Sequence, residues 1–421
     1  MNDNLHEKIN NIIEECEEEL KGDFKAIDQN AFILQQRVLN AFRENRVSDS
    51  HFSWNTGYGY DDAGRAVVES VYAQVFGAEK ALVRTNIVNG THAISLGILG
   101  VLKPGDSILY CTGEPYDTLK SIIGDENSPE PGTLNELGIG FDSIELVNDD
   151  FDYEKIREYV LKNNPKMVAV QRSTGYGWRI SITVNQLEKF INFIRSLNDQ
   201  IVIMVDNCYC EFVSKEEPSH LGADIVCGSL IKNPGGGLAL SGGYVVGNED
   251  LIDRISYRLT CPGIGGECGL TFGQTRSILQ GLFLAPHVTA GALKSAILFG
   301  RVYNKLGFDV CPTIDDERAD IIQAIRLNSK EAVSCFCKGI QSASPIDSFV
   351  EPVASEMPGY KDEVIMAAGT FVQGASIELS ADGPMREPYN VYYQGGLTYE
   401  HGKIGLVSTL EMLEKSTILT L

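Results

Sequence analysis

Residues 201–237 read IVIMVDNCYCEFVSKEEPSHLGADIVCGSLIKNPGGG and contain two short apolar segments. The first segment ends in Asp206, and the second ends in the sequence GSLIK, which closes on Lys232. Short apolar runs bounded by glycine and polar residues predict buried strands. The carboxyl ends of parallel strands lie at one edge of a sheet, where ligands bind. We therefore expect the Asp206 carboxylate and the Lys232 amine to face the same site.

This pairing of an amine with a carboxylate is typical of a pyridoxal 5′-phosphate site. The cofactor needs an amine for its Schiff base and an anion against its pyridine nitrogen, which keeps the ring protonated. We expect Lys232 and Asp206 to fill these roles and Ser229 to bind the phosphate. A solvated surface lysine explains Lys232 alone, but the paired aspartate and the following glycine run disfavour it. The sequence Ser-x-x-Lys also matches penicillin-recognising enzymes, although their Lys-Thr-Gly element is absent here.

The segments around this stretch alternate between strand and helix patterns. A helix is predicted over 65–76, where valines recur on one side before Gly77. Strands are predicted at 81–85, 106–111, 166–171, 201–206, 224–229 and 241–246. Further helices are predicted at 91–102, 116–123, 154–163 and 185–197. Such alternation indicates an α/β fold with parallel strands joined by crossover helices.

The remaining chain predicts an additional arm and a second domain. Apolar residues at helical spacing over 5–20 predict a helix that packs either on a partner or on its own domain. A long helix is expected at 276–300. Beyond it we expect a helix at 316–328, β-rich segments at 367–380 and 390–409, and a turn at Asp382-Gly383-Pro384. The predicted units are a helical arm, a large domain and a small α+β domain, at 1–50, 51–305 and 306–421.

Composition excludes several classes of partner. The formal net charge of −22 repels phosphate backbones and anionic lipid, so nucleic acid and membrane surfaces are disfavoured. No apolar run approaches the length of a membrane span, and the acidic N-terminus is unlike a secretory signal. The ten cysteines are then expected to be reduced, in a cytoplasmic protein. Cys-x-Cys pairs at 208–210 and 335–337 lack a second pair at zinc spacing, so no metal site is predicted.

Two further segments can contact the same cofactor. Asn89-Gly90-Thr91-His92 starts a predicted helix, and the free N–H groups of Gly90 and Thr91 suit a phosphate. An ordinary helix cap is the simpler interpretation of this segment alone. His92 is either a buried core histidine or a contact of the cofactor ring. Tyr116, after the strand at 106–111, can stack on that ring or merely cover a helix end.

Arginines are the expected clamps for a substrate carboxylate, because a guanidinium binds it with two hydrogen bonds. Arg172 and Arg179 follow the strand at 166–171, and Arg386 lies in the small domain. The sequence does not rank these three residues. The loop NTGYGYDD, which contains Tyr58, lacks the third glycine of a dinucleotide-binding motif and is otherwise a plain aromatic loop.

Taken in order, these segments resemble the fold-type I pyridoxal-phosphate enzymes of Cys/Met metabolism. Within them the chain is similar to the bacterial branch called methionine gamma-lyase-like or aluminium resistance proteins. The resemblance covers about 50–410 and is carried by GYGYDDAGR, NGTHA, GEPYDT, QRSTGYGWR, DNCYCEF and GSLIKNPGGG. The segments after Asp206 and after Lys232 depart from the better-known members, so the substrate does not transfer with the fold.

The resemblance implies a mostly parallel seven-stranded sheet and a smaller C-terminal domain. It implies that Lys232 forms the Schiff base, Asp206 contacts the pyridine nitrogen and Tyr116 stacks on the ring. Gly90, Thr91 and Ser229 would bind phosphate, with Tyr58 and Arg65 added by a neighbouring subunit of a homodimer or homotetramer.

The expected activity is a carbon–sulfur lyase that acts on a sulfur amino acid by β- or γ-elimination. Lys232 would act as the base, and Tyr116 or Tyr58 would protonate the departing thiolate. An aminotransferase, an aldolase and a non-catalytic stress protein of the same fold are the alternatives. Nothing in the sequence indicates chemistry with aluminium.

Overall fold

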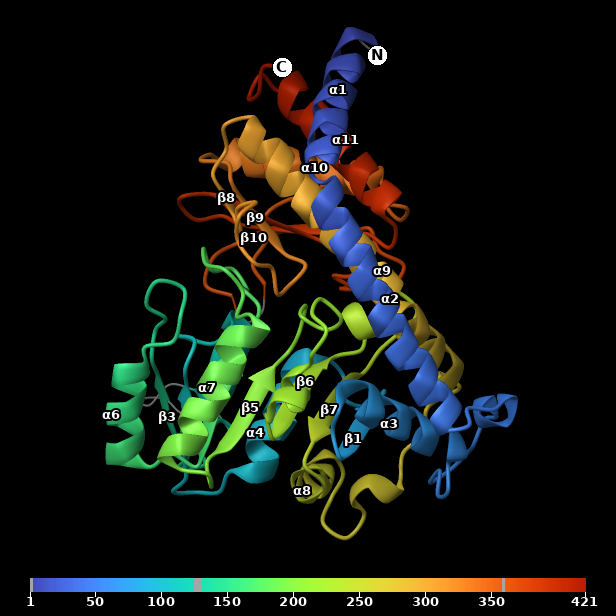
Figure 1. Ribbon diagram of the computed structural model, residues 1–421, viewed down its shortest axis with the longest axis vertical. Coiled ribbons are helices and arrows are strands. Elements are labelled where there is room, and N and C mark those ends of the chain that lie inside the picture. Colours follow the sequence, from blue (N-terminus) through green and yellow to red (C-terminus); the bar gives the residue numbers. More distant parts are fainter. Residues whose placement is uncertain (1–2, 125–130, 358–359) are drawn as a thin grey trace.

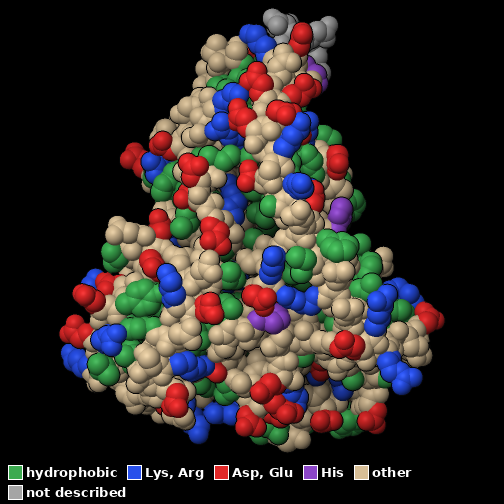
Figure 2. Space-filling model, in the orientation of Figure 1, with side chains coloured by type: hydrophobic (Ala, Val, Ile, Leu, Met, Phe, Trp, Pro, Cys, Tyr) green, Lys and Arg blue, Asp and Glu red, His purple; other side chains and the backbone are tan. Residues whose placement is uncertain are grey.

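The computed structural model describes residues 3–124, 131–357 and 360–421 and has two parts, each built around a β-sheet. The larger sheet lies in the lower half of Figure 1, and the smaller sheet lies above it. Acidic and basic side chains are interspersed over the face seen in Figure 2. The net negative charge therefore does not form a single patch on that face.

The larger sheet has seven strands in the order β1-β7-β6-β5-β4-β2-β3. Its central strands are parallel, whereas β7 runs antiparallel to both β1 and β6. The strands are β1 (Lys80–Arg84), β2 (Ser107–Tyr110), β3 (Gly140–Ser143), β4 (Met167–Gln171), β5 (Val202–Asp206), β6 (Ile225–Ser229) and β7 (Gly243–Gly247). Six strands were predicted from the sequence, and the mostly parallel fold is confirmed. The short, polar edge strand β3 was missed because it lacks an apolar run.

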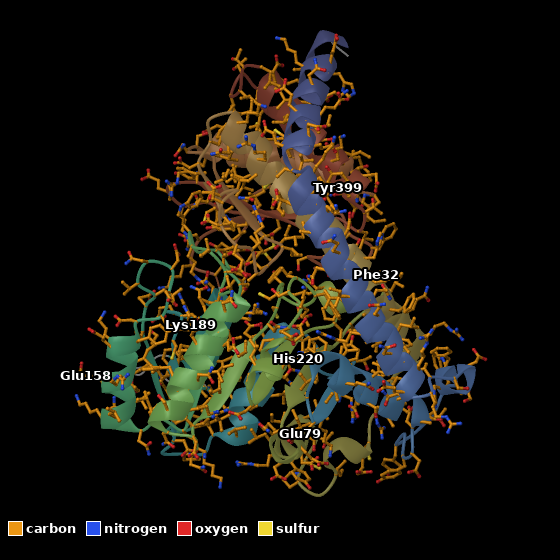
Figure 3. All side chains as sticks on the ribbon, in the orientation of Figure 1. Phe32, Glu79, Glu158, Lys189, His220 and Tyr399 are labelled. Atoms are coloured by element: carbon orange, nitrogen blue, oxygen red, sulfur yellow. The ribbon has the colours of Figure 1, made fainter. Side chains whose placement is uncertain are left out.

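Helices cover both faces of this sheet. One face packs against α4 (Gly90–Val101), α5 (Asp117–Ile123) and α8 (Glu249–Leu259). The other packs against α3 (Ala63–Phe76), α6 (Tyr153–Asn163) and α7 (Val184–Leu197). Successive strand residues point to opposite faces of the sheet, so Ile203 lies in one core and Met204 in the other. Polar side chains such as Glu158 and Lys189 lie on the outer sides of α6 and α7 (Figure 3).

The C-terminal sheet is antiparallel, with the order β10-β11-β12-β9-β8. It is covered by α10 (Lys330–Ala343) and α11 (Tyr399–Lys415), which pack against each other. Its strands are β8 (Val310–Cys311), β9 (Gln323–Arg326), β10 (Val364–Ala367), β11 (Ser380–Pro384) and β12 (Asn390–Gln394).

Several predictions for this part were wrong. The helix expected at 316–328 is a loop that leads into β9, and the β-rich segment at 367–380 is mostly an irregular connection. Its alternating apolar residues are buried by packing of the connection rather than by a sheet. The expected turn at 382–384 lies inside β11, and most of the second β-rich segment is α11. Leu406, Leu410 and Leu413 recur with helical spacing there.

The N-terminal helices pack within the chain. The apolar stripe of α1 (Asp3–Glu19) joins the C-terminal core, whereas buried residues of α2 (Lys21–Glu44) join the core of the larger sheet. The long helix α9 (Thr275–Lys305) runs beside α2 (Figure 1). Its first half contributes Leu282 to the larger core and its second half contributes Phe299 to the smaller one. The two cores therefore share α9. Of the two predicted alternatives for α1, the structure shows packing on its own chain.

Among the described residues, α9 is long and apolar enough to cross a membrane by length and composition. This finding contradicts the expectation that no apolar segment approaches that length. Of its most apolar window, 67% is buried inside the protein. Such burial is typical of a core helix.

Shortening a buried side chain of α1 should destabilise the C-terminal part. Ile13 is fully buried, so Ile13→Ala should lower the free energy of unfolding by about 2–5 kcal/mol because it leaves a cavity. The exposed neighbour Glu14 provides the control, since Glu14→Ala should change stability by less than about 0.5 kcal/mol. Urea unfolding of both variants measures the difference. Equal midpoints would contradict the packing of α1 on its own chain.

Candidate active site

Asp206 ends β5 and Ser229 ends β6, the neighbouring parallel strand. Lys232 follows three residues after Ser229. All three side chains line one cavity of about 240 Å³, which is far larger than the roughly 10–15 Å³ that a single water needs. We call it the Lys232 cavity. The structure thus places the amine and the carboxylate at one site, as the strand ends predicted.

The Lys232 and Asp206 side chains are electrostatically coupled. Lys232 Nζ lies 3.8 Å from the centroid of the Tyr209 ring, which stabilises the ammonium. Burial lowers the pKa of Lys232, but the acidic groups of Cys208, Tyr209 and Asp206 outweigh burial and raise that pKa overall. Burial raises the pKa of Asp206, and the Lys232 charge opposes this shift. Each charge therefore stabilises the other inside the protein.

The start of α4 forms another wall of the cavity. Gly90 and Thr91 line it, and the Asn89 side chain caps the helix by accepting a 2.8 Å hydrogen bond from His92 N. Thr91 Oγ1 lies 2.9 Å from Thr118 Oγ1, a cavity residue that the sequence did not suggest. These helix-terminal N–H groups and hydroxyls suit an anion such as a phosphate.

His92 does not line the cavity. Its Nδ1 accepts a 3.2 Å hydrogen bond from Val88 N, and burial lowers its pKa. The ring therefore stabilises the loop before α4, and the structure does not bring it to the position expected of a cofactor contact.

Tyr116 lines the cavity at the start of α5. Its N–H donates to Gln171 Oε1 at 2.9 Å, and its hydroxyl is hydrogen-bonded to the hydroxyl of Tyr360. The ring is thus held from both ends. Burial raises the pKa of Tyr116, so its phenol keeps its proton at neutral pH.

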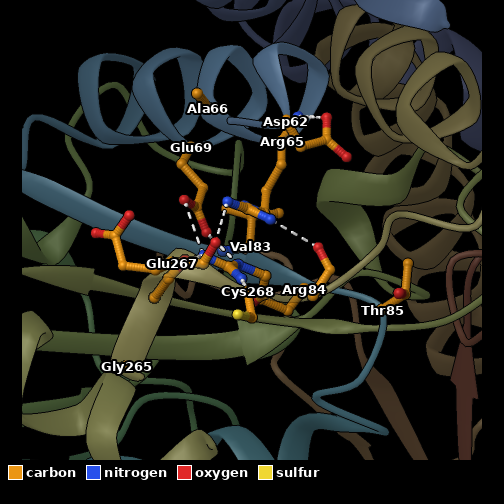
Figure 4. A network of polar contacts seen from close by, with 12 residues as sticks. Asp62, Arg65, Ala66, Glu69, Val83, Arg84, Thr85, Gly265, Glu267 and Cys268 are labelled. Carbon is orange, nitrogen blue, oxygen red and sulfur yellow. Dashed lines mark hydrogen bonds and ion pairs between the residues drawn. The ribbon is translucent and has the colours of Figure 1, made fainter. Parts of the chain in front are cut away.

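Tyr58 and Arg65 lie outside the Lys232 cavity of their own chain. The Tyr58 side chain is 74% exposed, which leaves it free to contact a neighbouring molecule. Arg65 Nη1 donates to Gly59 O at 2.7 Å and to Gly269 O at 2.8 Å. Its Nη2 donates to Glu267 O at 2.9 Å, and Figure 4 labels both of these residues. Arg65 therefore holds the Tyr58 loop against the segment before α9.

Arg172 does not reach the cavity. It is completely buried, and it donates from Nη1 to Asn207 Oδ1 at 2.7 Å and from Nε to Ile182 O at 3.2 Å. Asn207 in turn donates to Glu217 Oε2 at 2.8 Å. Arg172 thus belongs to a buried polar network that fixes the chain directly after Asp206.

Arg179 and Arg386 also lie outside the cavity. Arg179 Nη2 donates to Ser173 O at 2.6 Å, and Arg386 Nη1 lies 3.1 Å from Asp362 Oδ2 at the surface. The expected carboxylate clamp is therefore not formed within the described chain by any of the three arginines. Arg172 and Arg179 are directed to partners outside the cavity, and Arg386 is paired with Asp362 at the surface.

The C-terminal sheet adds cavity residues that sequence reasoning missed. Asp382 on β11 and Gln394 on β12 line the cavity, together with Tyr176, Tyr360 and Tyr392. Asp382 was taken for part of a turn, and the sequence analysis gave the three tyrosines no role. Asp382, Gln394, Tyr360 and Tyr392 lie far along the chain from Lys232, and no local signal joins them to the site.

The cavity fits pyridoxal phosphate in its donor set and its space. It offers an amine, a buried carboxylate, an aromatic ring and the start of a helix. A Cβ atom at Gly90 would lie 3.2 Å from Cys208 Sγ and 3.4 Å from Ser229 Cβ. Glycine at this position therefore keeps space open between α4 and β6, where the phosphate is expected.

Comparisons with known proteins agree with this geometry. The family model for methionine gamma-lyase matches residues 9–414. The uncharacterized protein YnbB of Bacillus subtilis (strain 168) is 47% identical over 408 residues, which cover 96% of each chain.

Solved structures extend the similarity to the coordinates. A candidate cystathionine beta-lyase involved in aluminum resistance from Clostridium acetobutylicum is 48% identical, with a TM-score of 0.94 over 97% of this chain and 96% of the other. A carbon-sulfur lyase involved in aluminum resistance from Clostridium novyi NT is 47% identical, with a TM-score of 0.92 over 96% and 95%. The pyridoxal-5′-phosphate dependent protein YhfS from Escherichia coli, at 18% identity and a TM-score of 0.62 over 93% and 97%, shares the fold.

Replacing Arg172 should separate a structural role from substrate binding. Arg172→Met leaves buried polar partners unsatisfied, so we expect the free energy of unfolding to fall by about 2–4 kcal/mol. The surface pair of Arg386 provides the control, and Arg386→Met should cost less than about 1 kcal/mol. Chemical denaturation measures both. Unchanged stability of Arg172→Met, with a raised KM alone, would restore the carboxylate role.

Proposed function

Since the chain belongs to the methionine gamma-lyase family, we propose that it is a pyridoxal-phosphate-dependent carbon–sulfur lyase that acts on a sulfur amino acid. The reaction is a β- or γ-elimination that releases a thiol, a 2-oxo acid and ammonia. The observation that carries this proposal is the placement of Lys232 and Asp206 in one buried cavity. The names of the Clostridium structures, a lyase in both cases, support the same reaction class.

Several cavity residues have a role in this proposal. Lys232 would hold the cofactor through its amine. Once the amino group of the substrate has displaced it, the freed Lys232 amine would take the Cα proton of the substrate as the general base. Asp206 would accept a hydrogen bond from the pyridine N–H and keep that proton in place. When bound, the cofactor supplies the ring that accepts the electron pair left at Cα. Gly90, Thr91 and Ser229 bind its phosphate.

Tyr116 stacks on the cofactor ring and is one of two candidate acids for the departing thiolate. Its raised pKa keeps the phenol protonated until the sulfur leaves. The other candidate acid is Tyr58 from a neighbouring subunit, because Tyr58 is exposed and lies outside the cavity of its own chain.

We place the protein in the cytoplasm as a homodimer or homotetramer. All ten cysteines are free, which suits a reducing compartment. The described lining of the cavity contains Lys232 as its only basic residue, although a phosphate and a substrate carboxylate both need cations. A neighbouring subunit that adds the exposed Tyr58 would complete the site, whereas the guanidinium of Arg65 is buried and bonded to backbone carbonyls of its own chain. The partners we propose are therefore a second copy of the chain and a small amino acid.

The reaction can be tested on the purified, cofactor-loaded protein with cystathionine, methionine and threonine. We expect thiol, ammonia and 2-oxo acid from a sulfur substrate, and Lys232→Ala should lower their release by about 10²–10⁴-fold and abolish the visible band of the bound cofactor. The exposed Lys189 on α7 (Figure 3) provides the control, because Lys189→Ala should change neither readout. Transfer of the amino group without thiol release would indicate an aminotransferase. Cleavage of threonine would indicate an aldolase, and cofactor binding without any turnover would indicate a non-catalytic protein.

Sharing of sites between subunits can be tested by mixing inactive variants. In a shared site Lys232 comes from one subunit and Tyr58 from the other. When equal amounts of the Lys232→Ala and Tyr58→Ala chains form dimers at random, about half of the dimers are mixed and one of their two sites keeps both native residues. About a quarter of all sites should therefore be active. Lys232→Ala mixed with Asp206→Asn provides the control, because both residues lie in the cavity of one chain and no site is restored. Turnover after refolding of each mixture measures recovery. No recovery in the first mixture would contradict a shared site.

A further inference from the structure

Asp382 is a carboxylate in the Lys232 cavity that the proposed reaction does not use. It lies on β11, whereas Asp206 lies at the end of β5, so the two carboxylates enter from different sheets. Gln394 Nε2 donates to Asp382 Oδ2 at 3.2 Å. Among the described residues, no lysine, arginine or histidine forms an ion pair with it. The carboxylate is therefore built into the cavity without a resident cation.

Three tyrosine rings lie around the same part of the cavity. The Tyr176 ring is 5.1 Å from the Tyr392 ring and 5.9 Å from the Tyr360 ring, measured between centroids. The Tyr392 hydroxyl donates to Tyr176 O at 2.6 Å, which fixes two of the rings relative to each other. The buried Tyr176 hydroxyl lies close enough to Asp382 to lower the pKa of that carboxyl by a hydrogen bond. Aromatic faces beside a carboxylate form a cage of the kind that binds an organic cation.

The charges of the cavity favour the same ligand. Its charged lining within the described chain consists of Lys232, Asp206 and Asp382. In the proposed function, Lys232 and Asp206 are both occupied by the cofactor, so Asp382 remains the unmatched charge. Burial raises the pKa of Asp382 to about 6, and hydrogen bonds with Tyr176 and Gln394 and the Lys232 charge oppose this shift. A buried carboxylate in this position is stabilised by a cationic partner.

We propose that Asp382, with Tyr176, Tyr360 and Tyr392, binds a positively charged group at the far end of the substrate side chain. The substrate class is then an amino acid with a second ammonium group beyond the carbon–sulfur bond that breaks. This inference rests on the proposed function for the position of that bond. A plain alkyl end such as that of methionine would leave Asp382 without a cation, and an anionic end would be repelled.

L-Lysine and L-norleucine test this charge directly, because they differ only by the terminal ammonium. We expect the cofactor-loaded protein to bind lysine about 10–100-fold more tightly than norleucine. In Asp382→Asn the ratio should fall to within about threefold, because the amide keeps the shape but loses the charge. Isothermal titration calorimetry measures each dissociation constant without any need for turnover. Asp362→Asn, a surface carboxylate outside the cavity, provides the control and should keep the wild-type ratio.

Equal affinity for the two amino acids in the wild-type protein, or no binding of lysine at roughly 10 mM, would overturn the inference even if Asp382→Asn failed to fold. The two proposals also fail differently. Thiol release without a preference for lysine would refute the cationic subsite and leave the lyase in place. A preference for lysine without any thiol release would refute the lyase and leave the subsite in place.

Discussion

The parallel pairing of β5 with β6 is the constraint on which the site depends. Because the two strands run in the same direction, their carboxyl ends bring Asp206 and Lys232 to one edge of the sheet. The antiparallel strand β7 follows on the other side of β6, and its turn begins with the glycine run after Lys232. An amine and a carboxylate that would each prefer water are thus kept together in a buried space.

A buried network beneath the cavity keeps this arrangement in place. Arg172, Asn207 and Glu217 are linked by hydrogen bonds directly behind the end of β5. Tyr244 on β7 donates to Glu211 Oε1 at 2.8 Å, and burial raises the pKa of that carboxyl to about 8. These groups contact one another rather than the cavity. They fix the backbone that carries Asp206 and Lys232. A reactive site depends on such fixed positions more than on added stability.

The second sheet decides what the cavity accepts. Helix α9 contributes to both cores and therefore holds the C-terminal sheet over the strand ends of the larger one. The carboxylate of Asp382 and two of the surrounding tyrosines come from this part. The cofactor residues thus belong to the larger sheet and the proposed selectivity residues mostly to the smaller. A change of substrate could arise in the smaller sheet without disturbing the residues that hold the cofactor.

The sequence by itself determined the mostly parallel sheet and the Lys232–Asp206 pair, because apolar strand periodicity and strand-end residues are local signals. The resemblance carried by its motifs gave the family and indicated that Gly90, Thr91, Tyr116 and Ser229 belong to the same site. Only the tertiary structure decided that the guanidinium of Arg172 is buried in a network and that α1 packs on its own chain. It alone brought Asp382 to Lys232, 150 positions away in the chain. Such contacts depend on how two cores pack through α9, and no local pattern records that packing.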